Sequence, residues 1–471
     1  MARASVATLP AAAMPSATTP ASTRVTVRVN RAPVVTPPIA AASTAAASAA
    51  SFNPLQTLAV ATDRLLTNTA NWLAGFPPNP ITDLLEGGLY LIRRTLFPSS
   101  VGVITSPIQV PMYFATINSD GAQKVGIYAS LGGNATPQFF EFDTGGKGFY
   151  ATYASADNEF SPWWGSAVTT STSSITNLYD SGLTYKGFAA TTTVSLFSAP
   201  GSPMPLVSTG RIDVAQIDSI TDGSTDLWTP NGSTTPPVDN VFWGDFGAAL
   251  DYAKNGIVNP LTQLVYACGV QPGFRVHIDE QNQTAWLQIG LTEADLRDPA
   301  AFFFPMVADP KAPEGATVPR SGLPFYSEQV FNAGINIFEN VDPVILDTGV
   351  GITTDTGAST TLHNTNLSPS ARDYDGIIEW SDPQTKIKGT LDNGLRFFLS
   401  GTTTAGSDAS FFDFRTNDRV NDGQVKVQNA GVNTGTYYLN TGIALFYAYD
   451  VIYSLGTTAG DGTIGFVPRN S

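Results

Sequence analysis

From about residue 101 to the C-terminus the sequence consists of short apolar runs, and turn-forming residues separate each run from the next. The runs include Ile108 to Phe114, Val125 to Ala129, Thr192 to Phe197 and Gly394 to Phe398, with Gly, Asn, Asp, Ser and Pro between them. This pattern is typical of β-strands joined by turns. Because one sandwich domain needs only about 100 residues, the sequence predicts an all-β fold with two lobes, residues 99–322 and 323–471.

The first 98 residues differ from the rest and divide into two segments. Residues 1–51 are low in complexity, rich in Ala, Pro, Ser and Thr, and contain no complete secretory signal, so we expect a linker without a packed core. Residues 52–98 place Leu at roughly helical spacing and predict a short helical tether. Two interpretations of 52–98 stay open: a hairpin packed on the main domain, or an anchor on a membrane or partner surface. No apolar run is long enough for a transmembrane helix.

Composition excludes several kinds of chemistry. A net charge of −15 argues against a nucleic-acid partner, because phosphate binding needs a basic stripe. One cysteine, Cys268, forms no intrachain disulfide and no Cys-based zinc site. Two histidines, His277 and His363, are too few for a His-rich metal centre. We therefore expect no metal ion and no cofactor, and carboxylate chemistry is what remains.

The tripeptide Asp-Thr-Gly occurs three times, and two copies share a context. Asp143-Thr144-Gly145 and Asp347-Thr348-Gly349 each end an apolar, strand-like run, and each run follows another one. This repetition indicates an internal duplication. The third copy, Asp355-Thr356-Gly357-Ala358-Ser359, follows Thr353-Thr354. We assign this third copy to a loop. Its sequence resembles the retroviral-protease form of the motif, so Asp355 stays the alternative to Asp347.

Two such Asp residues can meet across a pseudo-twofold axis. Carboxyls about 3 Å apart cannot both ionise and share one proton, as in the aspartic-protease dyad that exemplifies this effect. The ionised partner then acts as a general base on a water, and the protonated partner polarises the substrate carbonyl. We assign Asp143 and Asp347 as this pair. Thr144 and Thr348 supply hydroxyls that can bind the other lobe, and Gly145 and Gly349 allow close backbone approach.

On these motifs the chain from residue 101 onward resembles the pepsin-like bilobal aspartic proteases. The resemblance implies a later apolar-x-Gly segment in each lobe, for which 241–244 and 439–443 are candidates. It also implies a hairpin flap that carries a tyrosine, which we assign to Tyr179, with Tyr185 as second choice. The chain departs from the family where hydroxyls usually follow the motifs: Gly146-Lys147 and Val350 occupy those positions.

Four shorter sequence segments resemble the protease domains of mycobacterial PE and PE-PGRS proteins. The segments are 182–194, 261–264, 276–280 and 440–446. This resemblance implies a secreted or cell-envelope-associated enzyme that processes PE-family or other envelope proteins. Residues 1–51 do not have the pattern of a helical PE domain, which leaves the export route undefined.

The sequence therefore predicts a monomeric aspartic endopeptidase that hydrolyses a polypeptide with water activated by Asp143 and Asp347, under a flap in a cleft between the lobes. Two alternatives belong to other classes. The missing hydroxyls suggest a catalytically inactive relative that binds envelope partners. A glycoside hydrolase would also use two carboxylates, but it needs them about 5–10 Å apart.

Overall fold

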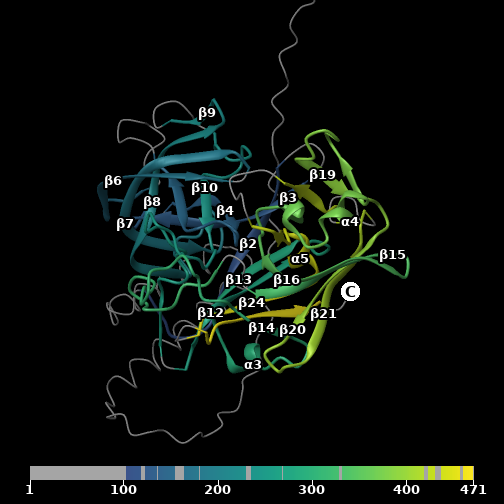
Figure 1. Ribbon diagram of the computed structural model, residues 1–471. Coiled ribbons are helices and arrows are strands. Elements are labelled where there is room, and N and C mark those ends of the chain that lie inside the picture. Colours follow the sequence, from purple (N-terminus) through teal and green to yellow (C-terminus); the bar gives the residue numbers. More distant parts are fainter. Residues whose placement is uncertain are drawn as a thin grey trace, which may run out of the picture.

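A computed structural model gives the structure of most of the chain after residue 101 (Figure 1). It describes residues 102–117, 122–134, 136–153, 164–179, 181–229, 235–267, 269–327, 331–417, 423–429, 436–456 and 460–469. The predicted linker 1–51 and the predicted helical tether 52–98 lie outside the described residues. No helix within the described ranges is long and apolar enough to cross a membrane.

Strands dominate the described part of the chain, and its helices are short. The helical elements found there are α3 (Glu293–Leu296), η1 (Thr365–Leu367), α4 (Ala371–Asp375) and α5 (Ala444–Ala448). The predicted all-β class is therefore confirmed, with two large sheets. A separate parallel pair joins β1 (Val103–Ile104) to β11 (Val265–Tyr266).

The larger sheet has 14 strands within the described residues. In order, neighbours hydrogen-bonded, they are β14 (Phe302–Pro305), β25 (Thr463–Pro468), β24 (Tyr449–Ser454), β12 (Gln271–Asp279), β13 (Thr284–Leu291), β2 (Ile108–Thr116), β3 (Gln123–Leu131), β4 (Gln138–Asp143), β10 (Gly244–Gly247), β5 (Phe149–Thr152), β8 (Val207–Asp222), β7 (Leu183–Phe197) and β6 (Val168–Leu178), with β9 (Thr225–Trp228) paired to β8.

The smaller sheet has nine strands in the part of the chain that the structure describes. Their order is β18 (Ile378–Trp380), β19 (Lys388–Leu391), β22 (Lys426–Gln428), β17 (Thr361–His363), β23 (Tyr438–Asn440), β16 (Asp342–Thr353), β15 (Phe331–Glu339), β20 (Arg396–Thr402) and β21 (Asp408–Arg415). All of them come after residue 330, whereas most strands of the larger sheet come before it.

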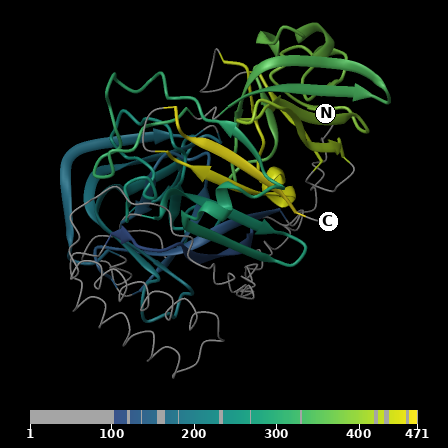
Figure 2. The same ribbon diagram turned by 90° about the horizontal axis from the view of Figure 1, so that it is seen from below.

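The C-terminal hairpin is the exception to this division. Strands β24 and β25 pair with each other, and β24 also pairs with β12 of the larger sheet. In Figure 2 these yellow strands lie next to teal strands of the larger sheet, away from most of the green smaller sheet. The predicted lobe boundary at 322/323 stays a prediction, but the last strands join the sheet that the earlier residues build.

One arrangement occurs in both sheets and positions the Asp-Thr-Gly motifs. Strand β4, which ends at Asp143, pairs in parallel with the later strand β10. Strand β16, which ends two residues before Asp355, pairs in parallel with the later strand β23. In each case the later strand also pairs antiparallel with the strand that follows the motif, β5 or β17. The predicted duplication is thus present in the topology, with the second copy of the motif shifted along the chain.

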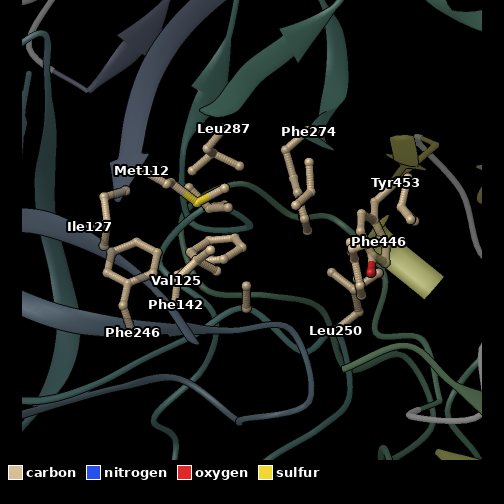
Figure 3. Close-up of a cluster of buried hydrophobic side chains, with 14 of the residues drawn as sticks. Met112, Val125, Ile127, Phe142, Phe246, Leu250, Phe274, Leu287, Phe446 and Tyr453 are labelled. Atoms are coloured by element: carbon tan, nitrogen blue, oxygen red, sulfur yellow. The ribbon is translucent and has the colours of Figure 1, made fainter. Parts of the chain in front are cut away.

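Below these motifs lies a continuous core of buried side chains. Figure 3 shows part of it, in which Phe142 of β4 and Phe246 of β10 share one cluster with Phe446 of α5 and Tyr453 of β24. Phe142 and Phe246 are both fully buried and stack with ring centroids 6.1 Å apart. Because close-packed interiors resist displacement, this floor holds the backbone beside Asp143 in place.

Candidate active site

Asp143 lies at the end of a strand that is buried on both faces. Phe139, Phe140 and Phe142 of β4 are all buried, so the strand is fixed up to the carboxylate. The backbone N–H of Gly145 donates to Asp143 Oδ1 at 2.8 Å and closes the turn. Gly247 of β10 lies opposite Asp143, and a Cβ at Gly247 would meet the Gly148 carbonyl oxygen at 2.4 Å. Only glycine lets the two segments approach this closely.

Asp355 occupies the equivalent position in the smaller sheet. Residues 350–356 are all buried, and Asp355 comes two residues after the end of β16. The backbone N–H of Gly357 donates to Asp355 Oδ1 at 2.7 Å, as Gly145 does for Asp143. Asn440 of β23 adds a side-chain hydrogen bond from Nδ2 to Asp355 Oδ2 at 2.6 Å.

The two turns are joined by reciprocal hydrogen bonds between their threonines. The backbone N–H of Thr144 donates to Thr356 Oγ1, and that of Thr356 donates to Thr144 Oγ1, both at 3.1 Å. Each hydroxyl donates in turn to the carbonyl that precedes the other motif's Asp: Thr144 to Thr354 at 3.0 Å, Thr356 to Phe142 at 2.6 Å. This pattern is symmetric about a local twofold axis between the turns.

The same axis brings the two carboxyl groups together. A Cβ at Gly145 would lie 2.5 Å from Asp355 Cγ, and one at Gly357 would lie 2.8 Å from Asp143 Cγ. The carboxyls of Asp143 and Asp355 are therefore neighbours across this axis. Burial raises the pKa of Asp143 well above its usual range, and the carboxyl of Asp355 raises it further. A pair in such contact can hold one shared proton. It is unlike the separated carboxylates of a glycoside hydrolase.

The prediction that Asp347 faces Asp143 is wrong. Asp347 lies within β16 and is 2% exposed, and its carboxylate accepts hydrogen bonds from the hydroxyls of Ser368, Ser370 and Tyr437. Thr348 and Gly349, predicted to support the pair, are exposed instead.

The physical reason is a bulge in the strand. The register of β15 on β16 shifts between Ala333 and Ile335, and Gly349 takes φ +70° at that place. The strand therefore continues past Gly349 to Thr353, and the second motif that follows a buried strand end is Asp355-Thr356-Gly357.

Three charged side chains near Asp143 were missed by the sequence analysis. Glu141 lies two residues before Asp143 on the same face of β4, and Asp245 lies opposite Glu141 on β10. Lys124 of β3 forms salt bridges with Glu141 at 2.8 Å and with Asp239 at 3.0 Å. Acidic residues inside the apolar strands Phe-Phe-Glu-Phe and Gly-Asp-Phe-Gly are a signal that could have pointed to them.

The hairpin β6–β7 reaches the site from above Asp245. Tyr179, at its tip, donates a hydrogen bond from its hydroxyl to Asp245 Oδ2 at 2.6 Å. Tyr185 of β7 is 2% exposed, and its ring packs edge-on against that of Tyr179 at 4.9 Å. Of the two tyrosines, Tyr179 is the one whose hydroxyl is held at a carboxyl next to the pair.

Lys147 and Val350 occupy positions at which the family usually has hydroxyl side chains, and neither is placed to replace such a hydroxyl. Lys147 forms a salt bridge with the buried carboxylate of Asp251 at 2.6 Å. Val350, which stands where a Thr was sought, is a buried strand residue. The second motif is the one at Asp355. There the side chain of Asn440 contacts Asp355 Oδ2.

The residues around Asp143 and Asp355 line one cleft of about 560 Å³. Asp143, Asp355, Tyr179, Tyr185, Glu141 and Asp245 all contribute to its surface. Asp143 and Asp355 thus lie in a cleft whose lining includes residues of the β6–β7 hairpin and residues of the smaller sheet.

No protein-family model matches the chain, and no curated protein matches it. Among solved structures the chain is similar to the crystal structure of an aspartic proteinase from Irpex lacteus. The two share 14% sequence identity, the TM-score is 0.45, and the match covers 78% of this chain and 98% of that one. What the site can do is therefore argued from its own geometry.

Proposed function

We propose that the protein is an aspartic endopeptidase whose catalytic pair is Asp143 and Asp355. The observation that carries the proposal is the symmetric threonine pairing, Thr144 with Thr356, which holds the two carboxyls in contact. Such an arrangement is costly to bury, because two acidic groups are removed from water side by side. Catalysis by a shared proton requires two adjacent buried carboxyls, which explains why this unfavourable burial is present.

The chemistry follows from the proton balance of the pair. With one proton between them, the ionised carboxyl takes a proton from a bound water as that water attacks the peptide carbonyl. The protonated carboxyl donates its proton to the carbonyl oxygen. When the C–N bond breaks, the carboxyl that took the proton of the water passes it to the leaving nitrogen, and the other carboxyl takes its proton back as the new carbonyl forms. The amides of Gly145 and Gly357 hold one oxygen of each carboxyl, so both groups keep their orientation during the transfer.

The substrate in this proposal is an extended polypeptide in the cleft. The β6–β7 hairpin acts as a flap over it, with Tyr179 at the tip. Closing a flap excludes bulk water and strengthens the electrostatic interactions inside.

The decisive experiment compares three Asp→Asn variants on a quenched-fluorescence peptide library. Asp143→Asn and Asp355→Asn should each lower kcat/KM by about 10²- to 10⁴-fold, the range expected for losing a general acid or base. Asp347→Asn is the matched control, because Asp347 is a buried Asp of the same tripeptide that is hydrogen-bonded elsewhere. Full activity in both Asp143→Asn and Asp355→Asn would overturn the proposal.

We further propose that the enzyme acts at a mycobacterial cell envelope on PE-family or other envelope proteins. The resemblance of residues 182–194 and 440–446 to the protease domains of PE and PE-PGRS proteins supports this. Incubation of a purified PE-family protein with the enzyme, followed by N-terminal sequencing of fragments, tests it. Cleavage of unrelated peptides but of no PE-family protein would remove this part and leave the endopeptidase proposal standing.

A further inference from the structure

The part of the cleft beside Asp143 contains two carboxyls that the catalytic pair does not require. Glu141 and Asp245 are 7% and 3% exposed, and they face each other across the parallel strands β4 and β10. A Cβ at Gly146 would lie 2.5 Å from Asp245 Oδ2 and 2.8 Å from Asp143 Oδ2. The carboxyl of Asp245 is therefore an immediate neighbour of the catalytic one.

The charges in this part of the cleft do not balance. Lys124, on the strand next to β4, is shared between Glu141 and Asp239, and Lys147, which also lines the cleft, is paired with Asp251. Asp245 forms no salt bridge with any described residue. Its Oδ2 accepts the Tyr179 hydroxyl, whereas its Oδ1 is buried and has no hydrogen-bond partner within the described chain. A buried carboxyl oxygen without a donor is destabilising, which indicates that a donor arrives with a ligand.

The walls around Asp245 are aromatic. Tyr179 and Tyr185 both line the cleft, and their rings are 4.9 Å apart. Aromatic rings above a carboxylate suit a side chain with an apolar stem and a cationic end, because the stem packs on the rings and the cation reaches the acid.

We propose that this pocket, formed by Glu141, Asp245, Tyr179 and Tyr185, binds the side chain of a Lys or Arg residue that flanks the scissile bond of the polypeptide substrate. The inference rests on the proposed endopeptidase function, since it places a substrate residue next to the catalytic pair. The cation of that side chain donates to Asp245 Oδ1. A neutral side chain of the same length would leave the oxygen buried and unpaired, so the pocket discriminates against it.

A bound cation also offsets the burial of Asp245. Burial raises the pKa of this carboxyl and favours its neutral form. An ammonium or guanidinium group within hydrogen-bonding distance favours the ionised form instead. Asp245 could also serve only to anchor the flap through Tyr179. That structural role uses Asp245 Oδ2 alone and gives no function to Oδ1.

The test is a peptide series in which each of the two residues flanking the scissile bond is Lys, Arg, norleucine or Glu. Norleucine matches the hydrocarbon stem of Lys without its charge. For the wild-type protein we expect Lys or Arg at one of the two positions to give kcat/KM about tenfold above norleucine. Asp245→Asn should remove most of this preference. Asp226→Asn, an exposed carboxyl on β9, is the control and should preserve it. Equal or faster cleavage of the norleucine peptides by the wild type would overturn the inference.

A binding measurement separates this inference from the proposed function. Fluorescence anisotropy of the Lys and norleucine peptides is measured on Asp143→Asn with and without Asp245→Asn. If no peptide is cleaved by the wild type, the endopeptidase proposal fails, yet tighter binding of the Lys peptide that depends on Asp245 still supports the pocket. If both peptides bind equally well, the pocket assignment fails, whether or not the wild type cleaves them.

Discussion

Thr144 and Thr356 each accept the other's backbone N–H at their side-chain oxygen, at 3.1 Å in both directions. The two residues are 212 positions apart in sequence, and both are at most 5% exposed. Their hydroxyls also donate to the carbonyls of Thr354 and Phe142, so each turn is held by the other. The closeness of the Asp143 and Asp355 carboxyls is thus imposed by neighbouring groups that do not themselves titrate.

The first prediction concerns this threonine pairing. Thr144→Val and Thr356→Val keep the side-chain shape but leave a buried amide and a buried carbonyl without partners. Each should lower the free energy of unfolding by about 1–3 kcal/mol and reduce kcat/KM. Because both substitutions loosen the same two turns, the double variant should cost less than the sum of the single ones. Urea unfolding of the four proteins measures this.

The control for that cycle is Thr402→Val. The Thr402 hydroxyl donates to Asp408 on an exposed hairpin, so its loss should change stability by about 0.5 kcal/mol or less. Strict additivity of Thr144→Val and Thr356→Val, with unchanged activity, would contradict the role assigned to the pairing.

The all-β class and the first Asp were accessible from the sequence for local reasons. Strand-length apolar runs between turn residues need no knowledge of tertiary contacts to be recognised. The run Phe139 to Phe142 leads without interruption into Asp143, and the structure keeps it as one strand. Local pattern and tertiary structure agree at this motif.

The second Asp was missed because local pattern and burial disagree there. Leu346, which precedes Asp347, is 56% exposed, whereas Thr353 and Thr354 before Asp355 are buried. An apolar residue is no guarantee of burial, and a threonine fits a buried strand. The bulge at Gly349 that shifts the strand is a feature of pairing between β15 and β16, and pairing is not readable from one strand alone.

Asp245 and Lys124 were missed for a different reason. Each becomes part of the site only through strand pairing with β4, in parallel by β10 and antiparallel by β3. Pairing partners such as Asp245 and Glu141, about a hundred residues apart, cannot be inferred from spacing in a single sequence. The buried acid in an apolar strand, as at Glu141, is the local signal that such a partner exists.

The second prediction concerns Asp347, whose carboxylate ties three hydroxyls to β16. In Asp347→Asn one oxygen becomes an NH₂ group that faces hydroxyl donors. The substitution should lower the free energy of unfolding by about 2 kcal/mol, while kcat/KM of the folded protein is retained. Asp373→Asn, an exposed carboxyl on α4, should leave both unchanged. Loss of activity without loss of stability in Asp347→Asn would reassign Asp347 to catalysis.

The third prediction concerns the tip of the flap. Tyr179→Phe removes the hydrogen bond to Asp245 and should raise KM, with a loss of about tenfold in kcat/KM, because a hydrogen bond to a carboxyl that holds the flap is lost. Tyr185→Phe keeps that bond and should lower kcat/KM less. Steady-state kinetics on one peptide compare the two, and a larger effect at Tyr185 would transfer the flap role to that residue.

The last prediction concerns stability in acid. Asp450 of β24 is 4% exposed and accepts hydrogen bonds from Arg275 at 2.6 Å and His277 at 2.7 Å, both on β12. Burial alone would raise the pKa of Asp450, but the hydrogen bonds and charges of His277 and Arg275 hold it below the usual value. A folded-state pKa below the unfolded one gives stability that is present above the unfolded pKa and is lost as pH falls through the folded pKa.

The free energy of unfolding of the wild type should therefore decrease as pH drops below about 4, the ordinary range of an Asp carboxyl. Asp450→Asn should cost about 3 kcal/mol at pH 6, because Arg275 keeps only Asp295 as a charged partner and His277 loses its carboxylate, and it should flatten this decrease. Asp413→Asn is the matched control, since Asp413 pairs with Arg396 on the exposed surface and such pairs contribute little. Urea unfolding of the three proteins at pH 3 and pH 6 measures the effect. The same pH dependence in Asp450→Asn as in the wild type would show that acid sensitivity comes from other carboxyls than the one that joins the C-terminal hairpin to β12.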